Sequence, residues 1–151
     1  MTVAVAEKDL TQEPVLEIVR TFSAPIEKVF EAFTTPDIVK QWWGPASMET
    51  TVAEFDLRPG GKWRTVMVNS DGDAFDVAGV YTEIDVPNRL VYTWAWLEGD
   101  TRGQETIVEL TFTKKGERTE LHLRQGSFVD GCAAHYEGWT GGLDNLEKLF
   151  A

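Results

Sequence analysis

The chain has 151 residues, of which 42% are apolar and 26% charged, a balance that indicates one globular domain and excludes a disordered chain. Its 14 basic and 25 acidic residues give a net charge of −11, spread evenly along the sequence, so nucleic acid is not expected as a partner, because such binding depends on neutralising phosphates. No apolar run approaches the length of a membrane span, the first eleven residues lack the pattern of a signal peptide, and the single cysteine, Cys132, cannot form an internal disulfide. We therefore expect a cytoplasmic protein without membrane insertion.

The N-terminal part of the chain predicts an arm followed by a strand. Residues 1–13 show no periodicity and are expected to form a flexible arm, which leaves residues 14–151 as a single domain. Residues 16–22 alternate between apolar and polar, as in a strand. Arg20 is the exception, because it shares the apolar face; if it points inward it needs a carboxylate partner or an anionic ligand, and otherwise it is expected near the sheet edge.

Two helix-start signals follow this strand. Pro25 stands in a first helical turn, where its missing N–H costs nothing, and the apolar residues after it recur at helical spacing. Pro36 begins a second short helix in the same way, and a Gly-Pro pair ends it. Of the adjacent Trp42 and Trp43, we expect one to pack into the core. The other is expected at a pocket mouth or on the surface, where it could mark a contact in a homodimer.

From residue 48 to residue 125 the apolar period changes to two, and turn signals divide this part into six strands. The connections are too short for helical crossovers, so the strands are expected to form an antiparallel meander. Together with the first strand they make a seven-stranded sheet. Gly79 interrupts one strand and could be a β-bulge that swaps the faces on either side of it.

The last part of the chain predicts one long helix. From Ser127 onward the apolar residues fall on one narrow stripe, namely Cys132, Tyr136, Trp139, Leu143, Leu146 and Phe150. Ser127 followed by Asp130 resembles a capping box at its start. The predicted fold is therefore α+β, with a twisted sheet that curls around this C-terminal helix.

Two features predict a small-molecule cavity between the sheet and the helix. Gly131, Gly138 and Gly142, with His135 between them, follow a second stripe of the helix. Each interior glycine costs about 1 kcal/mol relative to alanine, so three on one face indicate either close backbone approach or open space. Aromatic residues alternate along the facing strands and would supply apolar walls with a few polar tips. The candidate ligand-binding residues are Trp42, Trp43, Trp63, Met67, Phe75, Tyr92, Trp94, Trp96, Leu110, Phe112, Gln125, His135 and Trp139.

The same patterns also fit a plain core, because aromatic stripes in strands commonly do no more than pack, and helix glycines commonly permit tight contact. No Cys or His cluster has metal-ligand spacing, and no phosphate-binding or dinucleotide-binding glycine motif occurs, so we expect neither a metal nor a cofactor. His135 and Tyr92 are weak candidates for a general acid or base; a flanking histidine such as His135 is more often a hydrogen-bonded structural residue. His122 is expected to face solvent, and Cys132 to be a buried, inert thiol.

Several motifs, in their order and spacing, resemble a known superfamily. They are Phe22-Ser-Ala-Pro25, Val29-Phe30-Glu-Ala-Phe33-Thr-Thr-Pro36, Trp42-Trp43-Gly-Pro45, Arg58-Pro-Gly-Gly61, Pro87-Asn-Arg-Leu-Val-Tyr-Thr-Trp94 and Gly138-Trp139-Thr-Gly-Gly-Leu143-Asp-Asn-Leu146. From about Val15 to its end the chain resembles the START/birch-pollen-allergen-like (SRPBCC) superfamily, and within it the small bacterial members of the activator-of-heat-shock-ATPase homologue family. The resemblance implies the helix-grip fold: a curved seven-stranded antiparallel sheet wrapped around a long C-terminal helix, two short helices after the first strand, and a cavity between sheet and helix.

Three functions are compatible with this sequence. The superfamily resembled includes lipid and hormone carriers, aromatase/cyclases, oxygenase domains and co-chaperones, so the fold alone does not decide between them. The first expectation is binding of a small hydrophobic or amphipathic molecule in the cavity. The alternative is a cofactor-free cyclase or dehydratase acting on an enclosed polyketide-like substrate. A co-chaperone of a heat-shock ATPase ranks last, because the chain has one domain and no basic docking segment.

Overall fold

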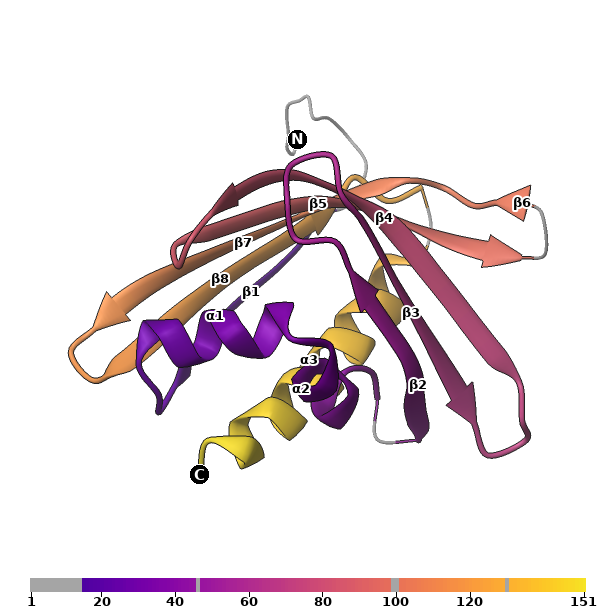
Figure 1. Ribbon diagram of the computed structural model, residues 1–151. Coiled ribbons are helices and arrows are strands. Elements are labelled where there is room, and N and C mark those ends of the chain that lie inside the picture. Colours follow the sequence, from indigo (N-terminus) through magenta and orange to yellow (C-terminus); the bar gives the residue numbers. More distant parts are fainter. Residues whose placement is uncertain (1–14, 46, 99–100, 130) are drawn as a thin grey trace.

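The computed structural model describes residues 15–45, 47–98, 101–129 and 131–151. In this part of the chain an antiparallel sheet curves over a C-terminal helix, α3 (Cys132–Leu149), which lies on its concave side (Figure 1). Two short helices, α1 (Ile26–Thr34) and α2 (Pro36–Trp42), lie on the same side. This arrangement is the predicted helix-grip fold; the arm expected at residues 1–13 lies outside the described residues.

The sheet consists of seven long strands and one very short one. Their bounds are β1 (Leu16–Phe22), β2 (Met48–Phe55), β3 (Lys62–Asn69), β4 (Ala74–Asp85), β5 (Arg89–Glu98), β6 (Thr101–Arg102), β7 (Thr106–Lys115) and β8 (Arg118–Gly126). The order across the sheet is β1-β8-β7-β5-β4-β3-β2, and β6 pairs only with β5. The strands from β2 to β8 therefore form the predicted meander, and β1 joins it at one edge beside β8.

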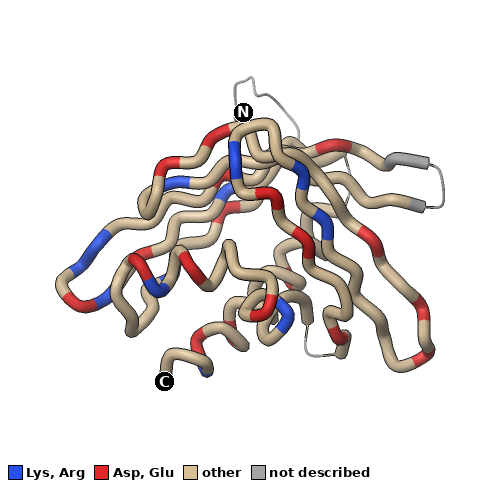
Figure 2. The backbone as a smooth tube through the Cα atoms, viewed as in Figure 1, with Lys and Arg blue, Asp and Glu red and all other residues tan. Residues whose placement is uncertain are grey.

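Register explains why the concave face is apolar. Ile18 pairs with Leu123, Leu123 with Leu110, and Leu110 with Leu90, so one row of buried side chains crosses four strands. Because side chains alternate along each strand, the residues between them point to the convex face. His122 is one of these; it is about half exposed and pairs with Glu17, in agreement with the prediction that it faces solvent. Figure 2 shows acidic residues distributed along strands, hairpins and helices, as the even charge distribution of the sequence implies.

Gly79, which the sequence left open as a possible β-bulge, is not one. Buried residues alternate regularly through Val77, Gly79 and Tyr81, and the register shift falls after Tyr81, before Glu83. Gly79 is required for a different reason: a Cβ there would lie 1.8 Å from the carbonyl oxygen of Thr93 on β5. The glycine therefore allows β4 and β5 to approach each other closely, without an extra residue.

The predicted start of the long helix is wrong. The helix begins at Cys132 and is preceded by Gly131 with φ +82°, and no side chain caps it; Asp130, the second residue of the proposed capping box, lies outside the described residues. Phe128 is 1% exposed, so the chain after Ser127 first runs along the core to bury this ring. The helix can therefore begin only after Phe128 is in place.

The apolar stripe of α3 is buried in its central and C-terminal part. Trp139, Leu143 and Leu146 are buried, but Tyr136 is 47% exposed, contrary to the prediction that it shares the core stripe. Cys132 is half-buried, and burial raises the pKa of its thiol, which keeps it in the unreactive form. The first turns of α3 therefore face an opening instead of solid core.

Arg20 points to the concave side of β1. It has carboxylate partners there, and β1 is an edge strand, so it also lies at the sheet edge. Its Nη1 lies 2.6 Å from Oδ1 of Asp144 and 3.5 Å from Oε1 of Glu147 on α3. The ion pairs link the first strand to the last helix.

Candidate functional site

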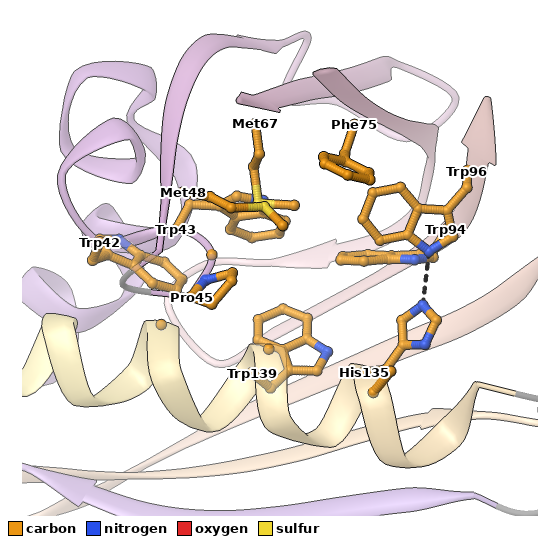
Figure 3. Close-up of a pocket in the computed structure, with 14 residues that line it drawn as sticks. Trp42, Trp43, Pro45, Met48, Met67, Phe75, Trp94, Trp96, His135 and Trp139 are labelled. Carbon is orange, nitrogen blue, oxygen red and sulfur yellow. Dashed lines mark hydrogen bonds between the residues drawn. The ribbon is translucent and has the colours of Figure 1, made fainter. Parts of the chain in front are cut away.

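A cavity of about 310 Å³ lies between α3 and the strands β3, β4 and β5. Its walls are the residues Trp42, Trp43, Gly44, Pro45, Met48, Met67, Phe75, Trp94, Trp96, Ala134, His135, Gly138, Trp139 and Gly142 (Figure 3). Both Phe75 at the start of β4 and Ala134 in the first turn of α3 are exposed, which places the mouth of the cavity between them. Among the residues that the structure describes, no Asp, Glu, Lys or Arg lines it.

All six tryptophans of the chain belong to one connected cluster around this cavity. Trp94 is at its centre, with ring centroids 5.7 Å from Trp43, 5.6 Å from Trp63 and 5.6 Å from Trp139. Trp96 lies 5.7 Å from Trp94 at nearly a right angle. The other three contacts of Trp94 are tilted, and this mutual packing of large rings gives the cavity firm aromatic walls on this side.

Trp42 and Trp43 come from the end of α2, where the chain turns under the sheet. Trp42 is 1% exposed and its Nε1 donates to the carbonyl oxygen of Ala32 at 2.9 Å. Trp43 is also buried, between the rings of Trp63, Trp94 and Trp139. One of the pair was expected to pack into the core, and both do. Neither therefore offers an exposed ring for a homodimer contact, which removes that reason to expect a homodimer.

The α3 glycines serve different purposes at different positions. A Cβ on Gly138 would meet no atom within 4 Å, so this glycine faces the open cavity. A Cβ on Gly142 would lie 3.2 Å from the carbonyl oxygen of Trp42 and 3.3 Å from the amide nitrogen of Gly44. Open space and close backbone approach, the two alternatives left by the sequence, therefore both occur, one turn apart. Gly131 serves neither purpose. It precedes the helix with a positive φ, a backbone conformation that favours glycine.

His135 is held by hydrogen bonds at both ring nitrogens. Its Nε2 accepts from Nε1–H of Trp96 at 2.8 Å, and its Nδ1 lies 2.7 Å from the carbonyl oxygen of Gly131, to which it donates. Because an indole N–H can only donate, Nε2 must carry the lone pair, and the imidazole is in its neutral Nδ1–H form. This agrees with the expectation of a hydrogen-bonded structural histidine.

A second polar chain fixes Trp139. Its Nε1 donates to Oε1 of Gln125 at 2.7 Å, and Nε2 of Gln125 donates to the hydroxyl of Thr106 at 2.9 Å. Gln125 and Thr106 are both buried, so their polar atoms are satisfied within the core.

Eight of the thirteen predicted ligand-binding residues line the cavity, and five do not. The eight are Trp42, Trp43, Met67, Phe75, Trp94, Trp96, His135 and Trp139. Of the other five, Trp63 lies behind the wall, where its Nε1 donates to the carbonyl oxygen of Thr93 at 2.9 Å. Gln125 holds Trp139 in place from outside the cavity.

The remaining three are core residues. Phe112 packs edge-on against Phe30 and Phe33 of α1, with centroids at 5.5 and 5.4 Å, because α1 fills the half of the concave face formed by β7 and β8. Leu110 is fully buried in the leucine row. Tyr92 packs on Tyr81 and Trp63, and burial raises its pKa well above the usual value. The tyrosine therefore stays protonated. Its side chain does not line the cavity.

Four lining residues, Gly44, Pro45, Met48 and Ala134, were not singled out by the sequence as ligand contacts. Gly44 and Pro45 have a local signal, since they end α2, but nothing in the sequence shows that this turn faces α3. A Cβ on Gly141 would lie 3.3 Å from Cα of Pro45, which shows how closely the turn and the helix approach.

Within the described part of the chain, no three His, Cys, Asp or Glu side chains gather as a metal site would require. Among the helices of the same residues, none has the length and apolar character needed to cross a membrane.

Comparison with known proteins places this fold in a family. The family model for "Activator of Hsp90 ATPase homolog 1-like protein" matches residues 23–151. No match was found among curated proteins.

Solved structures agree with the family match. The AHSA1 protein from Silicibacter pomeroyi is 30% identical and covers 89% of this chain and 96% of its own, with a TM-score of 0.79. A protein from Chromobacterium violaceum is 24% identical, covers 91% of this chain and 97% of its own, and has a TM-score of 0.81. A protein from Arthrobacter aurescens is 19% identical, covers 99% and 92%, and reaches 0.83. The last two support the fold alone; the family match and the first structure show that the chain belongs to the Activator of Hsp90 ATPase homolog 1-like family, within the SRPBCC superfamily.

Proposed function

We propose that the protein binds a small hydrophobic molecule in the cavity between the sheet and α3. The observation that carries this proposal is the position of Gly138, which faces open space in a cavity walled largely by aromatic side chains. A glycine inside a helix costs about 1 kcal/mol relative to alanine, and here no close contact requires it. Keeping the space open accounts for that cost.

The size of the cavity suits an aromatic molecule of two or three rings. An engineered apolar cavity of about 150 Å³ accommodates benzene, and this cavity has about 310 Å³. A ligand that buries about 200 Å² of apolar surface gains about 5 kcal/mol at about 25 cal/mol per Å². This gain opposes the loss of translational and rotational freedom on binding, and only the surplus appears as affinity.

The cyclase or dehydratase alternative receives less support from the geometry. Both nitrogens of His135 are already engaged, and the Tyr92 side chain lies outside the cavity wall. The co-chaperone alternative rests on the description of the family alone. A cytoplasmic location remains our proposal and is supported by the single, half-buried free cysteine.

The direct test is native mass spectrometry of the protein purified from its own host, followed by solvent extraction and identification of any retained compound. We expect a discrete mass increment from a compound that is released by organic solvent. If the protein carries no adduct and also fails to bind naphthalene at concentrations up to its solubility, the proposal is overturned.

A further inference from the structure

We propose that the cavity selects uncharged, planar molecules that present a hydrogen-bond acceptor to the indole N–H of Trp94. This inference rests on the proposed function and specifies the chemistry of the ligand. It follows from the hydrogen-bonding state of the polar groups in the cavity wall.

Trp94 carries a buried donor without a partner. Its Nε1 is shielded from solvent and makes no hydrogen bond to any described residue; the side chain is 6% exposed and lines the cavity. Among the described residues the other buried side-chain atoms of this kind are Oγ1 of Thr65 and Nε of Arg124, and neither residue lines the cavity. Trp94 is thus a lining residue of the cavity that carries an unmet donor, and because Nε1 itself is shielded in this structure, a ligand acceptor reaches it only if the neighbouring rings shift.

The neighbouring indoles show that this is not the general condition of the cluster. The N–H groups of Trp42, Trp96 and Trp139 donate to Ala32, His135 and Gln125, respectively. Buried donors in native proteins are nearly always paired, and an unpaired one costs about 1–3 kcal/mol. A ligand acceptor at Trp94 would remove that cost, which a purely apolar ligand cannot do.

The polar end of the cavity lies beside the pair formed by Trp96 and His135. Figure 3 shows the Trp94 ring edge-on next to Trp96 and above His135, with its nitrogen at the end near them. Since Nε2 of His135 already accepts from Trp96, this histidine leaves no free acceptor there for the Trp94 N–H. A carbonyl or ether oxygen of a ligand would supply one.

Charge is disfavoured in this cavity. Of the side chains described in the structure, no Lys or Arg lines it to meet a carboxylate, and no Asp or Glu lines it to meet an ammonium group. Removing an ion from water without a partner costs several kcal/mol. Aromatic rings can attract a cation, but a cation would leave the Trp94 donor unmatched and add like polarity beside it.

The test uses four probes on one ring system: naphthalene, 2-acetylnaphthalene, 2-naphthoate and trimethyl(2-naphthyl)ammonium, with affinities measured by calorimetry. We expect the wild-type protein to bind the ketone about three- to tenfold more tightly, relative to naphthalene, than the Trp94→Phe variant does, the range of one net hydrogen bond. Comparing the ketone-to-naphthalene affinity ratio of the wild type with that of the variant cancels the cost of desolvating the ketone, because both proteins have that cost. Both charged probes are expected to bind more weakly than naphthalene.

Trp63→Phe is the matched control, because Trp63 lies behind the cavity wall and its N–H already donates to the carbonyl oxygen of Thr93. It should leave the ratio of the ketone and naphthalene affinities unchanged. The inference would be overturned if Trp94→Phe left the ketone-to-naphthalene affinity ratio unchanged, or if either charged probe bound more tightly than naphthalene. In both cases, binding of naphthalene itself would still support the proposed function. Binding of none of the probes would instead overturn the proposed function.

If Trp94→Phe does not fold, the wild-type protein still gives an answer. In ¹H–¹⁵N spectra of the indole groups, 2-acetylnaphthalene should move one N–H resonance downfield beyond any shift caused by naphthalene. Identical spectral changes with the two probes would count against the hydrogen bond.

Discussion

Trp96 and His135 lie 2.8 Å apart, indole Nε1 to imidazole Nε2, and this hydrogen bond joins β5 to the first turn of α3 at the polar end of the cavity. The second imidazole nitrogen donates to Gly131, the residue that starts the helix. One histidine thus fixes both the start of α3 and a wall of the cavity, which accounts for its position without a catalytic role.

Replacing His135 with alanine is expected to lower the free energy of unfolding by about 1–3 kcal/mol, because two hydrogen bonds are lost and the Trp96 donor is left without its acceptor. Naphthalene binding should persist, since the apolar walls remain. Urea denaturation and calorimetry measure the two effects separately. Complete loss of binding in a variant that is still folded would show that His135 contacts the ligand directly.

Two glycines one turn apart are expected to respond oppositely to alanine. Gly138→Ala should raise the free energy of unfolding by about 1 kcal/mol, because the new methyl group meets open space and the helix gains propensity. Gly142→Ala should be at least about 1 kcal/mol less stable than Gly138→Ala, because its methyl group presses on the backbone of Trp42 and Gly44. Thermal unfolding of both variants gives the comparison. Equal stabilisation would mean that the α2–α3 contact is looser than the structure shows.

A larger residue at Gly138 should remove binding without harming the fold. The side chain of Gly138→Leu projects into the cavity, so we expect at least about a tenfold loss of naphthalene affinity, since part of the apolar volume for the ligand is taken. The matched control is Ala133→Leu on an exposed position of the same helix that does not line the cavity. Unchanged affinity in a folded Gly138→Leu variant would place the binding site elsewhere.

The elements of the fold were predictable because each is determined by a local pattern. The meander follows from the two-residue period between short turns, and α1 from the spacing of Ile26, Val29 and Phe33. The helix start was mispredicted because burial of Phe128 is a tertiary requirement that overrides the local capping signal. The role of Gly79 stayed open for the same reason: it depends on a carbonyl group of the neighbouring strand.

The cavity was predicted better than its boundary. The aromatic residues of β5 and the glycine face of α3 are visible as periodic patterns, whereas Phe112 and Leu110 have the same pattern and lie in solid core. What separates the two groups is α1, which covers the β7 and β8 side of the sheet. Sequence periodicity gives the face of a strand but not which helix covers it.

The ion pair between Arg20 and Asp144 is expected to contribute little to stability. The Asp144 side chain is 64% exposed, and exposed pairs of this kind contribute about 0.2–1 kcal/mol. A double-mutant cycle with Arg20→Met and Asp144→Asn measures the coupling, which should fall further at about 1 M salt, where the Debye length is about 3 Å. A coupling above about 2 kcal/mol that salt does not reduce would show that the pair behaves as a buried one.

Tyr81 and Tyr92 predict a loss of stability at alkaline pH. Both rings are buried, with centroids 5.8 Å apart, and burial raises both pKa values above the ordinary value of 10.0; for Tyr92 the Tyr81 charge adds to the effect. The folded protein therefore retains two protons that the unfolded chain releases once the pH exceeds about 10. The contribution of this pair is constant below that pH, and above it the free energy of unfolding should fall by up to about 1.4 kcal/mol per pH unit for each tyrosine.

Urea midpoints measured between about pH 8 and pH 11 test this prediction, since tyrosine titrates near pH 10. Tyr92→Phe should flatten the alkaline fall by about half, because one of the two retained protons is removed, and the double variant with Tyr81→Phe should flatten it further. Tyr136→Phe on α3 is the control, because Tyr136 is exposed and lies outside the buried pair. If the wild-type and double-variant proteins lost stability with the same slope above pH 10, the alkaline sensitivity would have to come from other groups, and the buried tyrosines would not act as the protonated core that the geometry implies.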